Sequence, residues 1–190
     1  MKTSNRTKQT GEVFTPTSLI NEMLTKLPSD FTQPDKTVLD PSCGNGQFLA
    51  EVLKQKTYPN AVKDIYGVDL MADNVADTVA RLAIIERYGI DPVNVDAQFR
   101  IQHSEYADNH DHKWLKNNYS SFNRTYQGTL EETDIHISVT FEYWDDGEAG
   151  VLRYTFNDGI SNFNPNIVCQ DALKYNYCFS KSKKSVLKWD

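Results

Sequence analysis

Residues 40–46 (DPSCGNG) have the types and spacing of a ligand-binding turn. A short apolar run precedes them and a helical pattern follows, so Gly44 and Gly46 fall between a predicted strand and a predicted helix. Glycine has no Cβ, and backbone N–H groups can therefore approach a ligand closely at such a turn. Asp40 at the strand end suits a cationic ligand better than a phosphate. Taken alone, the turn is equally compatible with a purely structural role.

Two further carboxylates follow predicted strands. Asp69 lies in the segment 64–70 (DIYGVDL), where a carboxylate can accept both ribose hydroxyls of a nucleoside, and Leu70 beside it can pack on an adenine face. The alternative is that Asp69 only caps the next helix. Asp171 ends a third apolar run, 167–171. Because parallel strands meet a ligand at their carboxyl ends, we expect Asp40, Asp69 and Asp171 to share one site.

The elements that must position these residues follow from hydrophobic periodicity. Apolar spacing predicts a helix over 17–27, with Thr17 or Ser18 as its N-cap, a helix after the glycine turn, and an amphipathic helix over 75–88 with one buried face. Strands are expected at 37–40, 64–70 and 167–171. This alternation is typical of an α/β fold with a parallel sheet.

The middle of the chain breaks the α/β pattern. Residues 103–130 are polar and show no period, so they are expected to form a long loop. Residues 135–143 and 151–156 alternate around an Asp-Asp-Gly turn, which predicts an antiparallel β-hairpin. We therefore expect a single domain over 1–190 with an insertion at about 98–165.

The segment 11–53 resembles the adenine-specific N6 DNA methyltransferases of restriction-modification and phage origin. In that family a G-x-x-[FY]-T-P segment, here Gly-Glu-Val-Phe-Thr-Pro from Gly11, precedes the glycine motif and helps to enclose the methionine end of the cofactor. The glycine motif matches 40–46, the ribose-binding acid matches Asp69, and the adenine-contacting acid matches Asp171. The resemblance covers about 11–97 and 166–178, whereas the insertion has no counterpart in the compact family core.

The resemblance implies a Rossmann-like class I S-adenosylmethionine-dependent methyltransferase fold, with a truncated parallel sheet and an inserted antiparallel β-hairpin. S-adenosylmethionine carries an ammonium and a sulfonium, which agrees with the cationic ligand expected from Asp40. The predicted cofactor contacts are Phe14, Thr15, Pro16, Asp40, Pro41, Cys43, Gly44, Asn45, Gly46, Phe48, Asp69, Leu70, Asp171 and Ala172.

The family's catalytic tetrapeptide, [DNS]-P-P-[YFW], is not found in this sequence. The most similar string, Asn164-Pro165-Asn166, lies before the third motif and lacks both the second proline and the aromatic residue, so no catalytic residue is predicted. The expected function is methyl transfer to adenine in DNA, alone or through a partner. The alternatives are a catalytically inactive cofactor-binding regulatory or counter-restriction protein, and an interaction protein that reuses the fold.

In the family the resemblance points to, a fourth strand follows the third motif, and it would begin about where this sequence ends, which gives an expectation about assembly. In the family's sheet order the strand ending at Asp40 lies centrally, and without a fourth strand its free edge would be unpaired. We expect a second polypeptide or a second copy to pair with it, unless 185–190 or the inserted hairpin folds over it.

Composition and charge limit the classes of partner and the cellular location that can be expected. The net charge of -6 argues against a general nucleic-acid binder, although basic residues cluster at both ends as solvated tails or phosphate contacts: Lys2, Arg6, Lys8, Lys181, Lys183, Lys184 and Lys188. With a mean hydropathy of -0.58 and no long apolar run, a cytoplasmic protein without a membrane partner is expected.

Cysteine and histidine usage predicts neither a disulfide framework nor a metal site. Cys43, Cys169 and Cys178 are an odd set without a CxxC pair, which favours reduced thiols. His110-Asp111-His112 has no further spaced ligand, so no metal is predicted. The aromatic residues of the insertion are expected either to form a small core or to stack on bases.

Overall fold

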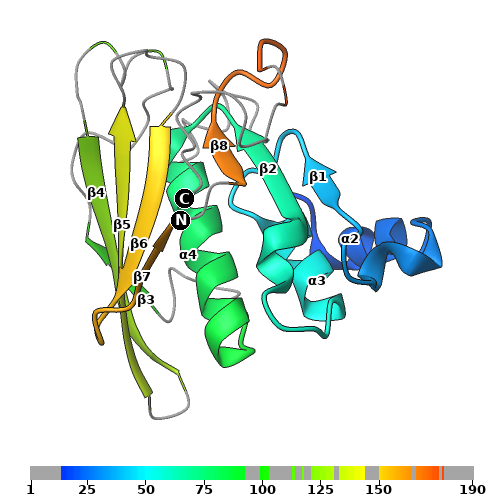
Figure 1. The fold of residues 1–190 in the computed structure, drawn as a ribbon, viewed down its shortest axis with the longest axis horizontal. Helices are drawn as coiled ribbons and strands as arrows, with labels where there is room; N and C mark the ends of the chain where they lie inside the picture. The colour runs from blue at the N-terminus through cyan, green and yellow to red at the C-terminus, as the bar shows by residue number, and fades with distance from the viewer. Residues whose placement is uncertain are drawn as a thin grey trace.

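The computed structural model describes residues 14–92, 99–102, 113, 117, 121–130, 133–143, 150–163, 166–175 and 177. Within these ranges a three-stranded parallel sheet and a five-stranded antiparallel sheet lie on either side of a long helix, as Figure 1 shows. The mixed α/β architecture predicted from the sequence is therefore confirmed.

The parallel sheet has the order β1-β2-β8 and holds the predicted strand ends at one edge. Its strands are β1 (Val38–Asp40), β2 (Ile65–Asp69) and β8 (Ile167–Cys169), and both pairings are parallel. The three predicted strands are confirmed. Within the described part of the chain β2 is the middle strand and β1 is an edge, so no described strand occupies the fourth-strand side of β1.

Three α-helices accompany this sheet: α2 (Thr17–Leu24), α3 (Gln47–Gln55) and α4 (Ala72–Tyr88). Short 3-10 turns, η1 (Ser29–Thr32) and η2 (Ala61–Asp64), precede β1 and β2. The predicted N-cap of α2 is wrong by one or two residues, because Pro16 is the cap and its carbonyl accepts the N–H groups of Leu19 and Ile20. Proline fits there because its fixed φ and missing N–H cost nothing at a helix start.

The segment predicted to be an insertion forms more than the expected hairpin. Strands β3 (Phe99–Gln102), β4 (Ser121–Leu130), β5 (Thr133–Tyr143), β6 (Gly150–Phe156) and β7 (Ser161–Phe163) make one antiparallel sheet in sequence order. The β5–β6 pairing confirms the predicted hairpin. The loop expected over 103–130 is wrong for 121–130, which is β4. Its inward face includes buried Arg124 beside Tyr126, and a charged residue at an inward position hides the alternation of a strand.

Helix α4 is enclosed between the two sheets. It packs on β2 and β8 on one side and on β5 and β6 on the other, and all its residues from Ala72 to Ile85 are buried. The expectation of one buried face on this helix is therefore wrong. The antiparallel sheet covers the second face, where buried Asp77 accepts the Tyr126 hydroxyl of β4 at 2.7 Å.

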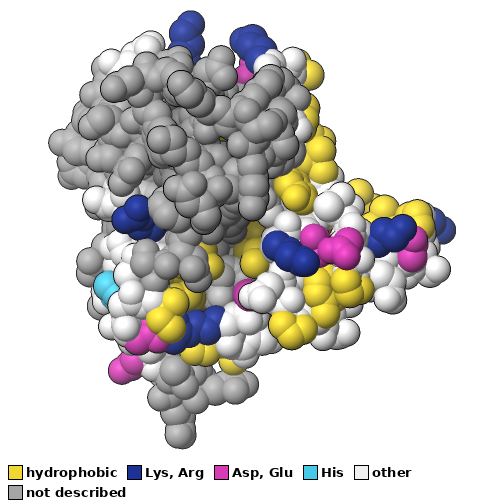
Figure 2. Space-filling model, viewed as in Figure 1, with side chains coloured by type: hydrophobic (Ala, Val, Ile, Leu, Met, Phe, Trp, Pro, Cys, Tyr) yellow, Lys and Arg dark blue, Asp and Glu magenta, His cyan; other side chains and the backbone are white. Residues whose placement is uncertain are grey.

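The face of the described part that Figure 2 shows is not uniformly basic. In the view of Figure 2, lysine and arginine side chains are scattered among acidic and hydrophobic ones. The basic chain ends predicted from the sequence lie outside the described residues. None of the helices in the described ranges is long and apolar enough to cross a bilayer.

Candidate functional site

The glycine turn between β1 and α3 depends on glycine at both positions. Gly44 and Gly46 have φ angles of +54° and +79°, in the left-handed region that favours glycine. A Cβ on Gly46 would lie 2.9 Å from Thr78 Cγ2, and one on Gly44 would lie 3.3 Å from Phe14 Cε1. The upstream Phe14 therefore lies against the turn, and a side chain at Gly46 would displace α4.

Asp69 joins this turn directly. Its Oδ2 accepts the N–H of Gly44 at 3.0 Å, and its Oδ1 accepts the N–H of Met71 at 2.8 Å and the side-chain amide of Asn74 at 3.1 Å. The residue is only 9% exposed. These donors fix the orientation of the carboxylate at the end of β2, so two of the predicted contacts, Gly44 and Asp69, form one unit.

Two residues of this unit were not predicted from the sequence. Asn74 contacts Asp69, and fully buried Thr78 donates its hydroxyl to the carbonyl of Gly44 at 2.9 Å. They stand four residues apart on α4 and so share one face of that helix. The sequence signal for them is a pair of polar residues four apart that follows the acid at the end of a strand. The same pattern also occurs on solvated helix faces, so it did not identify them.

Asp40 and Cys43 surround the same turn. Burial raises the pKa of Asp40, against the opposing effect of the hydrogen bond from the Ser42 N–H, and the charge of Asp69 raises it further. Burial also raises the pKa of the Cys43 thiol, with Asp69 and Asp40 adding to the effect. The thiol is therefore held in its protonated form. Two neighbouring carboxylates that disfavour each other's charge are stabilised by a cation placed near them.

Asp171 reaches this edge of the sheet through its backbone. The N–H of Gln170 donates to the carbonyl of Asp69 at 2.9 Å, which places the end of β8 beside the end of β2. The Asp171 carboxylate pairs with Lys174 Nζ at 2.9 Å, and the hydrogen bond from Lys174 lowers its pKa. In this structure the carboxylate contacts its own turn, and its predicted contact with a cofactor adenine stays a prediction.

The other predicted contacts border the turn or the neighbouring strand ends. Leu70 is 42% exposed beyond Asp69. The remaining half-buried or exposed members are Thr15, Pro16, Pro41, Phe48 and Ala172. The Gly11 position of the upstream motif lies outside the described residues, as do His110-Asp111-His112, the Asn164-Pro165 string and Cys178.

Two buried oxygens at the start of α3 bear on what the turn can hold. Asn45 Oδ1 and Gln47 Oε1 are buried, and neither has a hydrogen-bond donor in the described part of the protein. A buried acceptor without a donor costs about 1–3 kcal/mol. A ligand with several N–H donors, such as an ammonium, would satisfy such oxygens. Together with Asp40 and Asp69, they fit a cationic ligand that carries a ribose.

No metal site is evident in the ranges that the structure covers. There, no three side chains among histidine, cysteine, aspartate and glutamate gather in a way that could hold an ion. Cys43 and Cys169 are buried, and the Cys169 thiol donates to the Leu70 carbonyl at 3.5 Å.

The fold and this turn define an α/β protein with a candidate ligand site at its parallel strand ends. The N-6 DNA Methylase family matches residues 1–142, and the chain belongs to that family. The chain is also similar to the Type II methyltransferase M.VspI of Vibrio sp. (strain 343), with 33% identity over 86 residues, which are 45% of this chain and 19% of that protein. The chain thus spans only a minor part of this relative's length. No solved structure matches it.

Proposed function

We propose that the chain binds S-adenosylmethionine as part of an adenine-N6 DNA methyltransferase system, where it transfers a methyl group to adenine or helps a partner to do so. The observation that carries this proposal is the contact between the Gly44 N–H and Asp69 Oδ2 at 3.0 Å, which joins a glycine turn and an acid at adjacent parallel strand ends. Membership of the N-6 DNA Methylase family supports it.

In this proposal, different residues of the site contact different parts of the ligand. Asp69 accepts ribose hydroxyls, the turn from Gly44 to Gly46 lets the ligand approach the backbone, and Leu70 packs on the adenine. Asp40 favours the positive charge, and Phe14 closes the methionine end of the site. When bound, S-adenosylmethionine supplies an activated methyl group. The chain's own contribution is to orient this ligand and to shield part of it from water.

Calorimetric titration of the purified chain with S-adenosylhomocysteine and S-adenosylmethionine tests the proposal. We expect saturable binding of one ligand per chain. Adenosine monophosphate should bind much more weakly, because its phosphate would face the carboxylates of Asp40 and Asp69. Absence of binding, or equal binding of the anionic nucleotide, would contradict the proposal.

The alternative function is that of a catalytically inactive regulatory or counter-restriction protein that binds the cofactor. A chain that binds the cofactor without holding a target base would act as a regulatory or counter-restriction protein. Its cofactor site would be the same, so the titration above supports either function, and only a methyl-transfer measurement separates them.

The edge of β1 is the proposed place for a partner. Within the described chain β1 pairs with β2 alone, and Leu39 on it is 43% exposed. The alternative in which the inserted hairpin covers this edge is wrong, because that sheet packs on α4, on the far side of β2 and β8 from β1 (Figure 1). Residues 185–190 lie outside the described ranges. We propose that a second polypeptide or a second copy pairs with β1, since an unpaired strand edge is a template for pairing.

Sedimentation of the purified chain over a tenfold concentration range, combined with hydrogen exchange of the β1 amides, tests this assembly. We expect either concentration-dependent dimers, or a monomer in which the β1 amides facing away from β2 exchange rapidly. A strict monomer with all β1 amides protected would mean that the chain caps its own edge and needs no partner there.

A further inference from the structure

Helix α4 contacts the cofactor turn with one row of side chains and the inserted sheet with the adjacent row. Asn74 and Thr78 form the first row and hold Asp69 and the Gly44 carbonyl. Asp73 and Asp77 form the second row and face β4. Residues four apart lie one above the other on a helix, and each residue of the second row comes directly before a residue of the first row in the sequence. The same two turns of α4 therefore serve both contacts.

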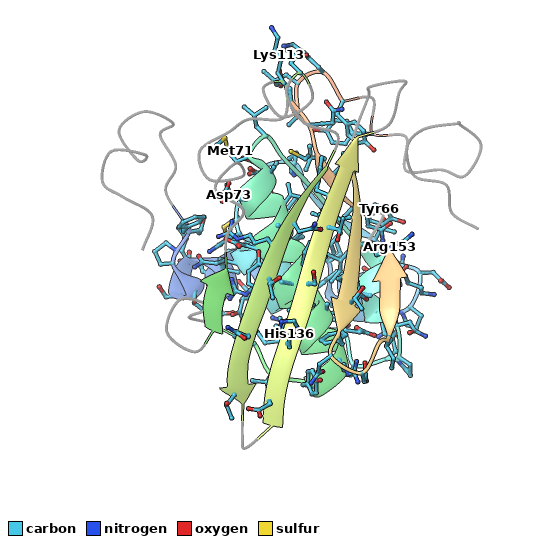
Figure 3. The ribbon with its side chains drawn as sticks, turned by 90° about the vertical axis from the view of Figure 1, so that its left-hand side faces the viewer. Tyr66, Met71, Asp73, Lys113, His136 and Arg153 are labelled. Atoms are coloured by element: carbon cyan, nitrogen blue, oxygen red, sulfur yellow. The ribbon has the colours of Figure 1, made fainter. Side chains whose placement is uncertain are left out.

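The contact with β4 is buried and polar. The Tyr126 hydroxyl donates to Asp77 Oδ1 at 2.7 Å, and Arg124 places its Nη2 atom 3.5 Å from the same oxygen and its Nη1 atom 3.9 Å from Asp73 Oδ2. All four residues are buried, Tyr126 completely. Figure 3 looks onto the inserted sheet from its outer side, with Asp73 and Met71 labelled at the start of α4 behind it.

This arrangement makes the position of α4 sensitive to β4. Two carboxylates and one guanidinium are removed from water here, and removing a partner from a buried charge is strongly destabilising. Burial and the charge of Asp77 raise the pKa of Tyr126, so its hydroxyl stays protonated and remains a donor. Loss of that donor would remove one of the buried partners of Asp77 and so weaken the attachment of the first turns of α4 to β4.

We propose that Tyr126 and Arg124 of the inserted sheet are positioning residues for the cofactor site. They hold the first two turns of α4, and through Asn74 and Thr78 they keep Asp69 and the glycine turn in the arrangement that binds ligand. This role rests on the proposed binding of S-adenosylmethionine. The inserted sheet then positions residues of the cofactor site in addition to covering α4.

The opposite end of α4 provides a matched control in the same sheet. There Arg87 pairs with Asp158, and its guanidinium lies 4.4 Å from the ring centroid of Phe156. Tyr88 packs edge-on against the same ring, with 5.9 Å between the ring centroids. These contacts also fasten the sheet to α4, but no hydrogen bond of the glycine turn involves them. A substitution there loosens the sheet without acting on Asn74 or Thr78.

The test compares Y126F with F156L by titration with S-adenosylhomocysteine, well below the melting temperatures of both variants. Y126F keeps the ring and removes only the hydroxyl, and we expect about 3–10-fold weaker binding, since the competent arrangement becomes a fraction of the population. F156L should lower the melting temperature and leave the affinity within about twofold of the unaltered chain. Equal affinity in Y126F and the unaltered chain overturns this inference alone, whereas no binding by the unaltered chain overturns the proposed function with it.

D77N provides the second variant if Y126F is too unstable to titrate. It keeps the volume and the acceptor for the Tyr126 hydroxyl, and it removes the charge that faces Arg124. We expect weaker binding of S-adenosylhomocysteine than in F156L. An affinity equal to that of F156L would mean that the sheet stabilises the domain without positioning its site.

Discussion

Replacing Asp69 with alanine should weaken binding of S-adenosylmethionine by about 1.5–3 kcal/mol, or roughly 10–150-fold. The proposed cause is the loss of a charge-assisted hydrogen bond to ribose. The structure adds a second cause, because the same carboxylate accepts the N–H groups of Gly44 and Met71 and the amide of Asn74. The variant therefore loses both a ligand contact and the group that holds the glycine turn.

Two controls separate these causes. Asp69→Asn keeps one acceptor oxygen for the turn and loses the charge, so its affinity should fall between those of the alanine variant and the unaltered chain. Asp158→Asn alters an aspartate whose partner is Arg87, at the far end of α4, and should leave binding unchanged. Calorimetry supplies the affinities and thermal melts report on folding. Unchanged affinity in Asp69→Ala would remove the central claim about the site.

The part of the site that the sequence predicted is the part determined by short segments. A turn with Gly44 and Gly46 after a strand-end acid is a local pattern, and the observed φ angles of +54° and +79° are its backbone requirement. The parallel pairing of β1, β2 and β8 followed from the alternation of strands and helices. Because carboxyl ends of parallel strands meet at one edge, the proximity of Asp40 and Asp69 could be predicted as well.

The part that the sequence did not predict depends on contacts between distant segments. Asn74 and Thr78 look like ordinary polar residues of a helix until the turn is folded against them. Asp73 and Asp77 would be read as a solvated face, and they are buried because Arg124 and Tyr126 arrive from β4, about fifty residues later. Periodicity within one segment holds no information about such a partner.

The inserted sheet was underestimated for the same reason. Its β5–β6 hairpin alternates cleanly and was found, whereas β4 carries Arg124 at an inward position and was not. An inward arginine is stable only where acidic partners compensate its burial, and those partners belong to α4. The inward arginine of β4 and the buried carboxylates of α4 therefore depend on each other. Neither the strand β4 nor the burial of that helix face could be predicted from its own segment.

The 190-residue chain is expected to transfer no methyl groups to adenine in DNA at a measurable rate by itself. In the family that the sequence resembles, the Asn or Asp and the prolyl carbonyl of [DNS]-P-P-[YFW] accept hydrogen bonds from the target amino group, and the aromatic ring stacks on the flipped base. Loss of one pre-organised hydrogen-bonding group in an active site typically costs about 10²–10³ in rate. This sequence contains no such tetrapeptide to supply any of these groups.

The measurement is the transfer of labelled methyl groups from S-adenosylmethionine to adenine-containing DNA. The same preparation must bind S-adenosylhomocysteine, so that a negative result cannot come from an empty cofactor site. Activity that appears when a second polypeptide carrying the tetrapeptide is added identifies this chain as the cofactor-binding part of a split enzyme. Continued inactivity with such a partner favours the regulatory function. Robust transfer by the chain alone would contradict the prediction and would mean that residues outside the family's pattern hold the target base.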